Sequence, residues 1–185
     1  MKVTPTNIPG VVVIEPSVFS DTRGSFRTVF HAIDYAAAGV EYRFVQDNVS
    51  ESRRGVLRGL HFQHPRGQGK LVYALSGEVF DVAVDVRFDS PTFGRAVWTT
   101  LSEENHRQVF IPPGFAHGFA VTSEHAVIAY KCSAPYAPDC EQVVRWNDPT
   151  FDIPWPVLEP ILAPRDADAP PLANIPAERL PRVGS

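Results

Sequence analysis

The stretch VFDVAVDVRF, residues 79–88, decides the fold class of this chain. Its even positions, from Phe80 to Phe88, all carry large apolar side chains, whereas Asp81 and Asp85 stand among the odd positions. Successive side chains of a β-strand point to opposite faces, so this period of two predicts an antiparallel strand with one face on a core.

Short apolar runs separated by turn residues fill much of the remaining chain. We predict further strands at residues 11–15, 70–75, 95–100, 108–111, 118–122, 126–132 and 141–146. The 18 prolines and 12 glycines leave few windows for long helices, and one short helix is expected at 31–38, stopped by Gly39. Many short strands at near-regular spacing predict an all-β sandwich or jelly-roll barrel with short helices.

Length, charge and cysteine content narrow the class of protein. The whole chain of 185 residues is expected to form a single domain, with a Pro-rich tail from about residue 147 that wraps the barrel and then frays. The net charge of −4 argues against binding nucleic acid by bulk charge. No apolar run approaches the roughly 20 residues of a membrane span. Two cysteines are too few for a disulfide framework, so we expect a reduced, cytoplasmic protein.

Reactive side chains gather in two places. His61 and Lys70 flank a Gly-rich turn, and the run IPPGFAHGF at 111–119 brings His117, followed by Tyr130. The Pro-x-Gly-x-x-His spacing matches the second signature of cupin barrels. The first signature, two histidines one residue apart and then a glutamate, is missing. An ammonium group repels a cation, so no metal is expected and a metal-dependent cupin oxygenase is disfavoured.

These four side chains fit the chemistry of proton transfer next to a ketone. A histidine can take the proton, Lys70 and His117 can donate to an oxygen that gains negative charge, and Tyr130 can return a proton. The residues alone also allow simpler roles: Tyr130 as a core side chain, and Lys70 as a charge at a strand edge.

The same residues lie in a longer pattern that resembles the dTDP-4-dehydrorhamnose 3,5-epimerase family over about residues 8–172. The matching stretches are 45–48, 56–63, 68–72, 77–87, 90–94, 111–119, 130–131, 146–149 and 165–166. The resemblance implies a cupin-type jelly roll that works as a homodimer without metal or other cofactor. It implies that dTDP-4-dehydro-6-deoxy-D-glucose is epimerised at carbons 3 and 5 to dTDP-4-dehydro-L-rhamnose.

The resemblance also implies roles for individual residues. His61 is expected to be the base with Asp166 as its partner, and Tyr130 the acid on the opposite face. Lys70 and His117 are expected to face the carbonyl oxygen or adjacent hydroxyls. Substrate contacts are implied for Arg23, Gln46, Asp47, Asn48, Arg58, His117, Tyr136, Glu141 and Arg165. The arginines would surround the diphosphate and Tyr136 would stack on thymine. The segment around Arg23 is suited to reaching a neighbouring subunit's site.

Three departures from the family pattern bear on specificity. Thr28 replaces a usual glutamate, Val49 a usual histidine, and Arg165 a usual lysine. They leave open a mono-epimerase acting at carbon 3 or 5 only, or a related epimerase that uses another nucleotide sugar. A non-catalytic sugar-nucleotide-binding cupin is a more distant alternative, because binding alone requires no base and acid on opposite faces.

Overall fold

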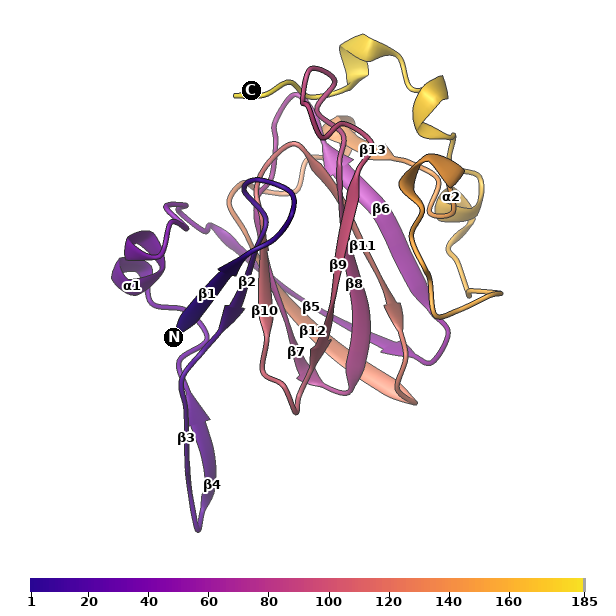
Figure 1. The fold of residues 1–185 in the computed structure, drawn as a ribbon. Helices are drawn as coiled ribbons and strands as arrows, with labels where there is room; N and C mark the ends of the chain where they lie inside the picture. Colours follow the sequence, from indigo (N-terminus) through magenta and orange to yellow (C-terminus); the bar gives the residue numbers. More distant parts are fainter. Residues whose placement is uncertain (185) are drawn as a thin grey trace.

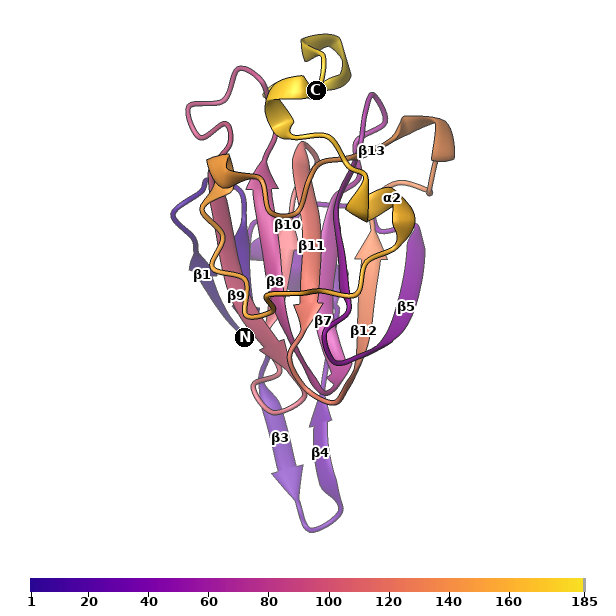
Figure 2. The same cartoon turned by 90° about the vertical axis from the view of Figure 1, so that its right-hand side faces the viewer.

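The computed structural model describes residues 1–184 and contains two β-sheets that face each other (Figures 1 and 2). The first sheet has the order β1 (Lys2–Pro5), β2 (Val12–Glu15), β10 (Gln108–Ile111), β7 (Lys70–Ser76), β12 (His125–Cys132) and β5 (Gln46–Arg53). The second has the order β13 (Glu141–Val143), β6 (Leu57–Gln63), β11 (Phe115–Val121), β8 (Glu78–Asp85) and β9 (Ala96–Ser102). The strand pairings in both sheets are antiparallel, which confirms the predicted all-β jelly roll.

Short elements connect and extend the sheets. A hairpin of β3 (Val18–Asp21) and β4 (Gly24–Arg27) projects away from the barrel (Figure 1). The predicted helix is confirmed as α1 (Ala32–Ala37). The later part of the chain forms η1 (Pro138–Cys140), η2 (Pro149–Phe151), α2 (Pro164–Ala167), η3 (Leu172–Asn174) and η4 (Ala177–Arg179). None of the helices within residues 1–184 is long and apolar enough to cross a membrane.

Strand β8 is buried on both faces, so the prediction of a single buried face is wrong. Its odd-numbered side chains, such as Val79, join the core between the two sheets. Its even-numbered side chains, such as Val82, lie on the outer face and are covered by the C-terminal segment. The carboxylates of Asp81 and Asp85 are therefore almost inaccessible, at 1% and 0% exposure. A buried charge is costly unless it has polar partners, and both carboxylates have them.

The C-terminal segment, residues 147–184, runs across the outer face of the second sheet (Figure 2). Phe151, Leu172, Ile175 and Leu180 pack there in one apolar cluster with the even-numbered side chains of β8. The segment does not fray before Leu180, which is 4% exposed, because this cluster continues to that point. The same packing holds α2 against β6, at the edge of the functional site.

Candidate active site

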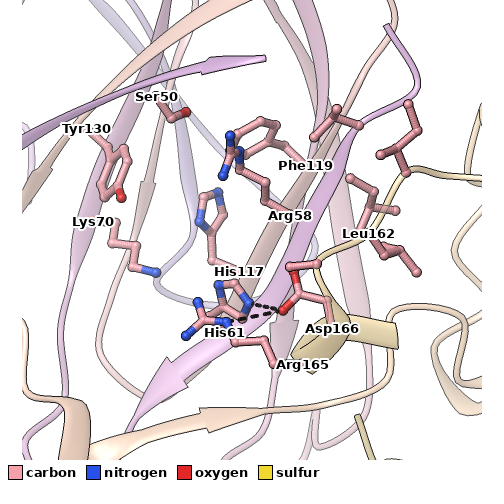
Figure 3. A pocket seen from close by; sticks show the side chains of 14 residues that line it. Ser50, Arg58, His61, Lys70, His117, Phe119, Tyr130, Leu162, Arg165 and Asp166 are labelled. Atoms are coloured by element: carbon pink, nitrogen blue, oxygen red, sulfur yellow. Dashed lines mark hydrogen bonds and ion pairs between the residues drawn. The ribbon is translucent and has the colours of Figure 1, made fainter. Parts of the chain in front are cut away.

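Two adjoining cavities lie between the sheets. The first has a volume of about 310 Å³ and is lined by His117 together with residues of both sheets and the C-terminal segment (Figure 3). The second, of about 290 Å³, is lined by Tyr136 among others. We call them the His117 cavity and the Tyr136 cavity. They share His61, Lys70, Tyr130 and Arg165, so three of the four side chains expected to be reactive stand where the two cavities meet.

The two cavity histidines are neighbours because β6 and β11 come unusually close together. His61 on β6 is the cross-strand partner of His117 on β11. Beside this pair, Gly59 and Gly118 face each other, and a Cβ on Gly118 would stand 2.6 Å from the backbone oxygen of Arg58. Gly59 has φ +137°, a conformation that other residues rarely adopt. Gly59 and Gly118 are therefore required for the close backbone contact that brings the imidazoles of His61 and His117 together.

His61 is paired with a carboxylate from the C-terminal segment. Its Nε2 lies 2.7 Å from Asp166 Oδ1, and the amide of Gly59 donates to Asp166 Oδ2 at 3.2 Å (Figure 3). Burial by itself raises the pKa of Asp166, but the His61 contact, the Gly59 amide and nearby Arg165 outweigh it and hold that pKa below its usual range. The charged carboxylate of Asp166 accepts a hydrogen bond from Nε2–H of His61, so the other ring nitrogen carries no hydrogen and is free to accept a proton.

His117 has a carboxylate partner of its own, which the sequence reading missed. Its Nε2 lies 2.8 Å from Oδ2 of Asp81 on β8. Burial lowers the pKa of His117; Lys70 and His61 act in the same direction, while Asp81 opposes them. The available signal was a carboxylate in the middle of an otherwise apolar strand, because such a group needs a buried partner.

The facing sheet contributes Lys70 from β7 and Tyr130 from β12. Burial lowers the pKa of Lys70, and the charges of Asp81 and Glu141 act against that shift. Burial also raises the pKa of Tyr130, so its hydroxyl keeps its proton at neutral pH. Lys70 and Tyr130 thus stand across the cavity from the two histidines (Figure 3).

Polar residues expected to contact a nucleotide line the Tyr136 cavity. The hydroxyl of Tyr136 donates to Glu141 Oε2 at 2.8 Å, and Arg165 Nη1 donates to the same oxygen at 2.5 Å. Arg165 Nε also lies 3.6 Å from Asp166 Oδ1, which links this cluster to the His61 pair. Gln46 lies in the cavity wall beside them, and its Oε1 accepts from the Tyr136 amide at 2.8 Å.

Of the other residues expected to contact the substrate, two line the cavities and two point elsewhere. Asn48 lines the Tyr136 cavity, and Arg58 lines the His117 cavity. Asp47 points to the opposite face of its strand, where it pairs with Lys131 at 2.8 Å. Arg23 lies on the projecting hairpin, outside both cavities, in an ion pair with Asp21. Arg23 was expected to contact the substrate, but it does not line the cavities of its own chain, because the hairpin carries it away from the barrel.

The donor set does not suit a metal ion. Among residues 1–184, no group of three or more His, Cys, Asp or Glu side chains is arranged to hold one. Each cavity histidine already uses its Nε2 on a carboxylate, and the ammonium of Lys70 lines the same cavity. A cation placed there would be repelled by Lys70.

A jelly roll with two carboxylate–histidine pairs facing a lysine and a tyrosine belongs to the class of cupin-type acid–base enzymes. The family model for dTDP-4-dehydrorhamnose 3,5-epimerase matches residues 5–174. The chain belongs to this family of isomerases.

Individual relatives agree with this membership. The dTDP-4-dehydrorhamnose 3,5-epimerase of Pseudomonas aeruginosa is 50% identical over 94% of this chain and 97% of its own length. The dTDP-6-deoxy-D-glucose-3,5-epimerase of Legionella pneumophila, solved with dTDP-4-keto-L-rhamnose, is 49% identical, covers 100% of this chain and 99% of its own, and superposes with a TM-score of 0.96. A 3′-monoepimerase of Streptomyces bikiniensis, solved with dTDP-quinovose, is 38% identical over 97% of this chain and 92% of its own, with a TM-score of 0.89.

Proposed function

We propose that this chain epimerises dTDP-4-dehydro-6-deoxy-D-glucose at carbons 3 and 5 and so forms dTDP-4-dehydro-L-rhamnose. Family membership supports the reaction class, and the two relatives at 49% and 50% identity are double epimerases by name. The observation that carries the proposal is the position of His61 and Tyr130, which line one cavity from opposite sheets. Inversion of a carbon requires a base on one face and an acid on the other.

In the proposed mechanism His61 removes the proton from a carbon next to the C4 ketone. The electron pair of the broken C–H bond forms a carbon–carbon double bond, and the negative charge moves to the ketone oxygen. Tyr130 then gives its proton to the opposite face of the same carbon, which restores the ketone and inverts the centre. Solvent returns a proton to Tyr130 and takes one from His61, and the cycle repeats at the second carbon.

Lys70 is the stronger candidate for stabilising the enolate oxygen. Its ammonium has no acidic partner at ion-pair distance among residues 1–184 and is free to donate. Because burial lowers the pKa of His117, that imidazole is neutral near pH 7, and its single proton is used on Asp81. Its remaining nitrogen is an acceptor, so we assign His117 to a hydroxyl group next to the ketone.

The nucleotide is assigned to the Tyr136 cavity. Thymine would stack on Tyr136, which is half exposed, with Gln46, Asn48 and Glu141 as its polar surroundings. The guanidinium groups of Arg58 and Arg165 would meet the diphosphate, because a planar fork matches two phosphate oxygens. The side chain of Asp47 points away, which leaves only its backbone as a contact.

Incubation of the enzyme with its substrate in D₂O, followed by NMR, tests the proposed reaction. A double epimerase places deuterium at both carbon 3 and carbon 5 of the product, whereas a mono-epimerase labels one of them. His61→Asn keeps a side chain of similar shape without the base, and it should bind dTDP but exchange neither proton. Labelling at one carbon would support the mono-epimerase alternative, and unchanged exchange in His61→Asn would remove His61 as the base.

The mechanism is proposed to need no metal, which is directly testable. We expect full turnover after exhaustive chelation and less than stoichiometric metal by elemental analysis, because the proton transfers use only side chains. One transition metal per chain, with activity lost on its removal and regained on its return, would contradict the mechanism.

We further propose that the chain forms a single domain and acts as a homodimer. The hairpin exposes Phe19 and Phe26, which are 67% and 69% accessible and pair across β3 and β4. Apolar groups exposed in this way favour association with another surface. A second copy would cover them and would receive Arg23 at the diphosphate of its own bound substrate.

The cysteines support a separate proposal about the cellular compartment. Cys132 and Cys140 form no disulfide, which supports a reducing compartment such as the cytoplasm.

A further inference from the structure

Strand β5 has a polar face toward the cavities, where the barrel core would otherwise be apolar. Gln46 and Asn48 line the Tyr136 cavity, and Gln46 Nε2 donates to Asn48 Oδ1 at 3.0 Å. Further along the same face, Ser52 Oγ accepts from Arg58 Nε at 3.0 Å. Asn48 in turn contacts Cys132 Sγ at 3.4 Å. These three polar side chains of the face are therefore engaged within the protein.

Ser50 is the exception on this face. Its Oγ is one of two buried side-chain polar atoms that have no hydrogen-bond partner among residues 1–184, and the other, Nδ1 of His106, lies outside both cavities. Ser50 lines the His117 cavity, and Figure 3 shows its hydroxyl directed toward the centre of the pocket. Buried polar atoms in native proteins are nearly always satisfied, so an unsatisfied one that faces a cavity indicates a ligand contact.

Strand register fixes what lies on either side of Ser50. Three alternate residues of β12, Cys132, Tyr130 and Ile128, define a row. Cys132 pairs with Lys70 of β7, and Ile128 pairs with Ser50 of β5. Tyr130 thus stands between Lys70 and Ser50, with steps of roughly 7 Å along the strand. The bond from Arg58 to Ser52 holds the guanidinium group at the Ser50 end of the row.

We propose that the Ser50 hydroxyl hydrogen-bonds the hydroxyl at carbon 2 of the bound hexose and selects for sugars that carry it. This inference rests on the proposed function, which puts the C4 ketone at Lys70 and the diphosphate on carbon 1 near Arg58. Carbon 2 lies between carbon 1 and the reacting carbon 3, so its hydroxyl falls between Arg58 and Tyr130. A neutral serine hydroxyl can both donate to and accept from a sugar hydroxyl.

Binding of two unreactive ligands tests the proposal without turnover. dTDP-quinovose has the 2-hydroxyl but no ketone, and its 2-deoxy counterpart lacks only that hydroxyl. By calorimetry, wild type should prefer dTDP-quinovose by about tenfold, equivalent to about 1.4 kcal/mol. Ser50→Ala should bind the two sugars equally and bind dTDP itself as wild type does, which also shows that the variant is folded.

Ser52→Ala is the matched control, two residues away on the same face. Loss of its bond to Arg58 should weaken dTDP and both dTDP-sugars by one common factor and preserve the preference for the 2-hydroxyl. The proposal is overturned if Ser50→Ala keeps that preference. It is equally overturned if Ser50→Ala binds dTDP, which carries no hexose, more weakly than wild type does, because the hydroxyl would then contact a phosphoryl oxygen. Absence of turnover in wild type would overturn the proposed function and leave this binding comparison readable.

Discussion

At the scale of single residues, the two cavity histidines differ in where their carboxylates come from. Asp81 belongs to the barrel itself, whereas Asp166 is brought in by the C-terminal segment. Asp81 therefore stays with His117 as long as the sheet is intact. The pair of His61, the proposed base, with Asp166 depends in addition on the docking of α2 against the barrel.

The proposed acid makes a sharp prediction, because it separates proton removal from inversion. In Tyr130→Phe the enolate still forms, but His61 returns a solvent-derived proton to the face that it left. In D₂O we expect deuterium in recovered substrate and little epimer, measured by NMR and mass spectrometry. Tyr73→Phe, a tyrosine on β7 that lines neither cavity, should behave as wild type. A Tyr130→Phe enzyme that inverts as fast as wild type would exclude Tyr130 as the donor.

Asp166 makes a prediction about stability and pH. Its pKa is lower in the folded chain than the unfolded value of about 3.9, so its contacts stabilise the fold fully above that value and lose this effect as pH falls through the folded pKa. At pH 7, Asp166→Asn should lower the free energy of unfolding by about 1.5–3 kcal/mol.

Urea unfolding of wild type and Asp166→Asn from pH 7 to pH 3 measures this linkage. The difference between the two proteins should hold down to about pH 4 and then narrow. Asp168→Asn, an exposed neighbour in the sequence, should show no such difference. A gap that stays constant to pH 3 would mean that Asp166 is not held in its charged form by these contacts.

At the scale of elements, the contact between β6 and β11 sets the geometry of the site. Gly118→Ala places a Cβ against the backbone of Arg58, and overpacking of this kind costs about 1–3 kcal/mol. We expect a large loss of kcat as well, because His61 and His117 move apart. Gly39→Ala has open space and a φ of +88°, so it should lose stability through backbone strain but keep wild-type kcat. Equal kcat in the two variants would contradict the role of the glycine contact.

The strands differ in whether the sequence alone could predict them. The strands around β8 were predictable because apolar side chains alternate on them. β5 and β6 were not predicted as strands, since the polar side chains that serve the cavities interrupt that alternation. The hairpin β3–β4 has almost no buried residue in one chain, so it carries no core pattern at all.

The partner of His61 shows a different limit. Residues 61 and 166 are 105 positions apart, and no local pattern connects them. Asp166 could be named only through resemblance to a family. Asp81, in contrast, was visible as a charge in an apolar strand and was missed because the strand's second face was taken to be exposed.

At the scale of the whole molecule, the position of Arg23 predicts that two chains cooperate. If Arg23 serves the partner's site, a mixed dimer of Arg23→Ala and His61→Asn chains has one site with both side chains intact. Mixing the two weak variants, after subunit exchange, should recover part of the wild-type turnover. Sedimentation should report dimers throughout. No recovery in demonstrably mixed dimers, or an active monomer at micromolar concentration, would contradict this arrangement.

The late position of Asp166 has a consequence for how the enzyme is made. Synthesis proceeds from the N-terminus, and every barrel strand, up to Val143, is added to the chain before Asp166. The nascent barrel therefore passes through a stage in which His61 is present without its carboxylate and the apolar outer face of β8 is still bare. Docking of the last segment covers that face and supplies the carboxylate of the proposed base in one step, so a chain cut short before Asp166 exposes the apolar face and lacks the partner of His61.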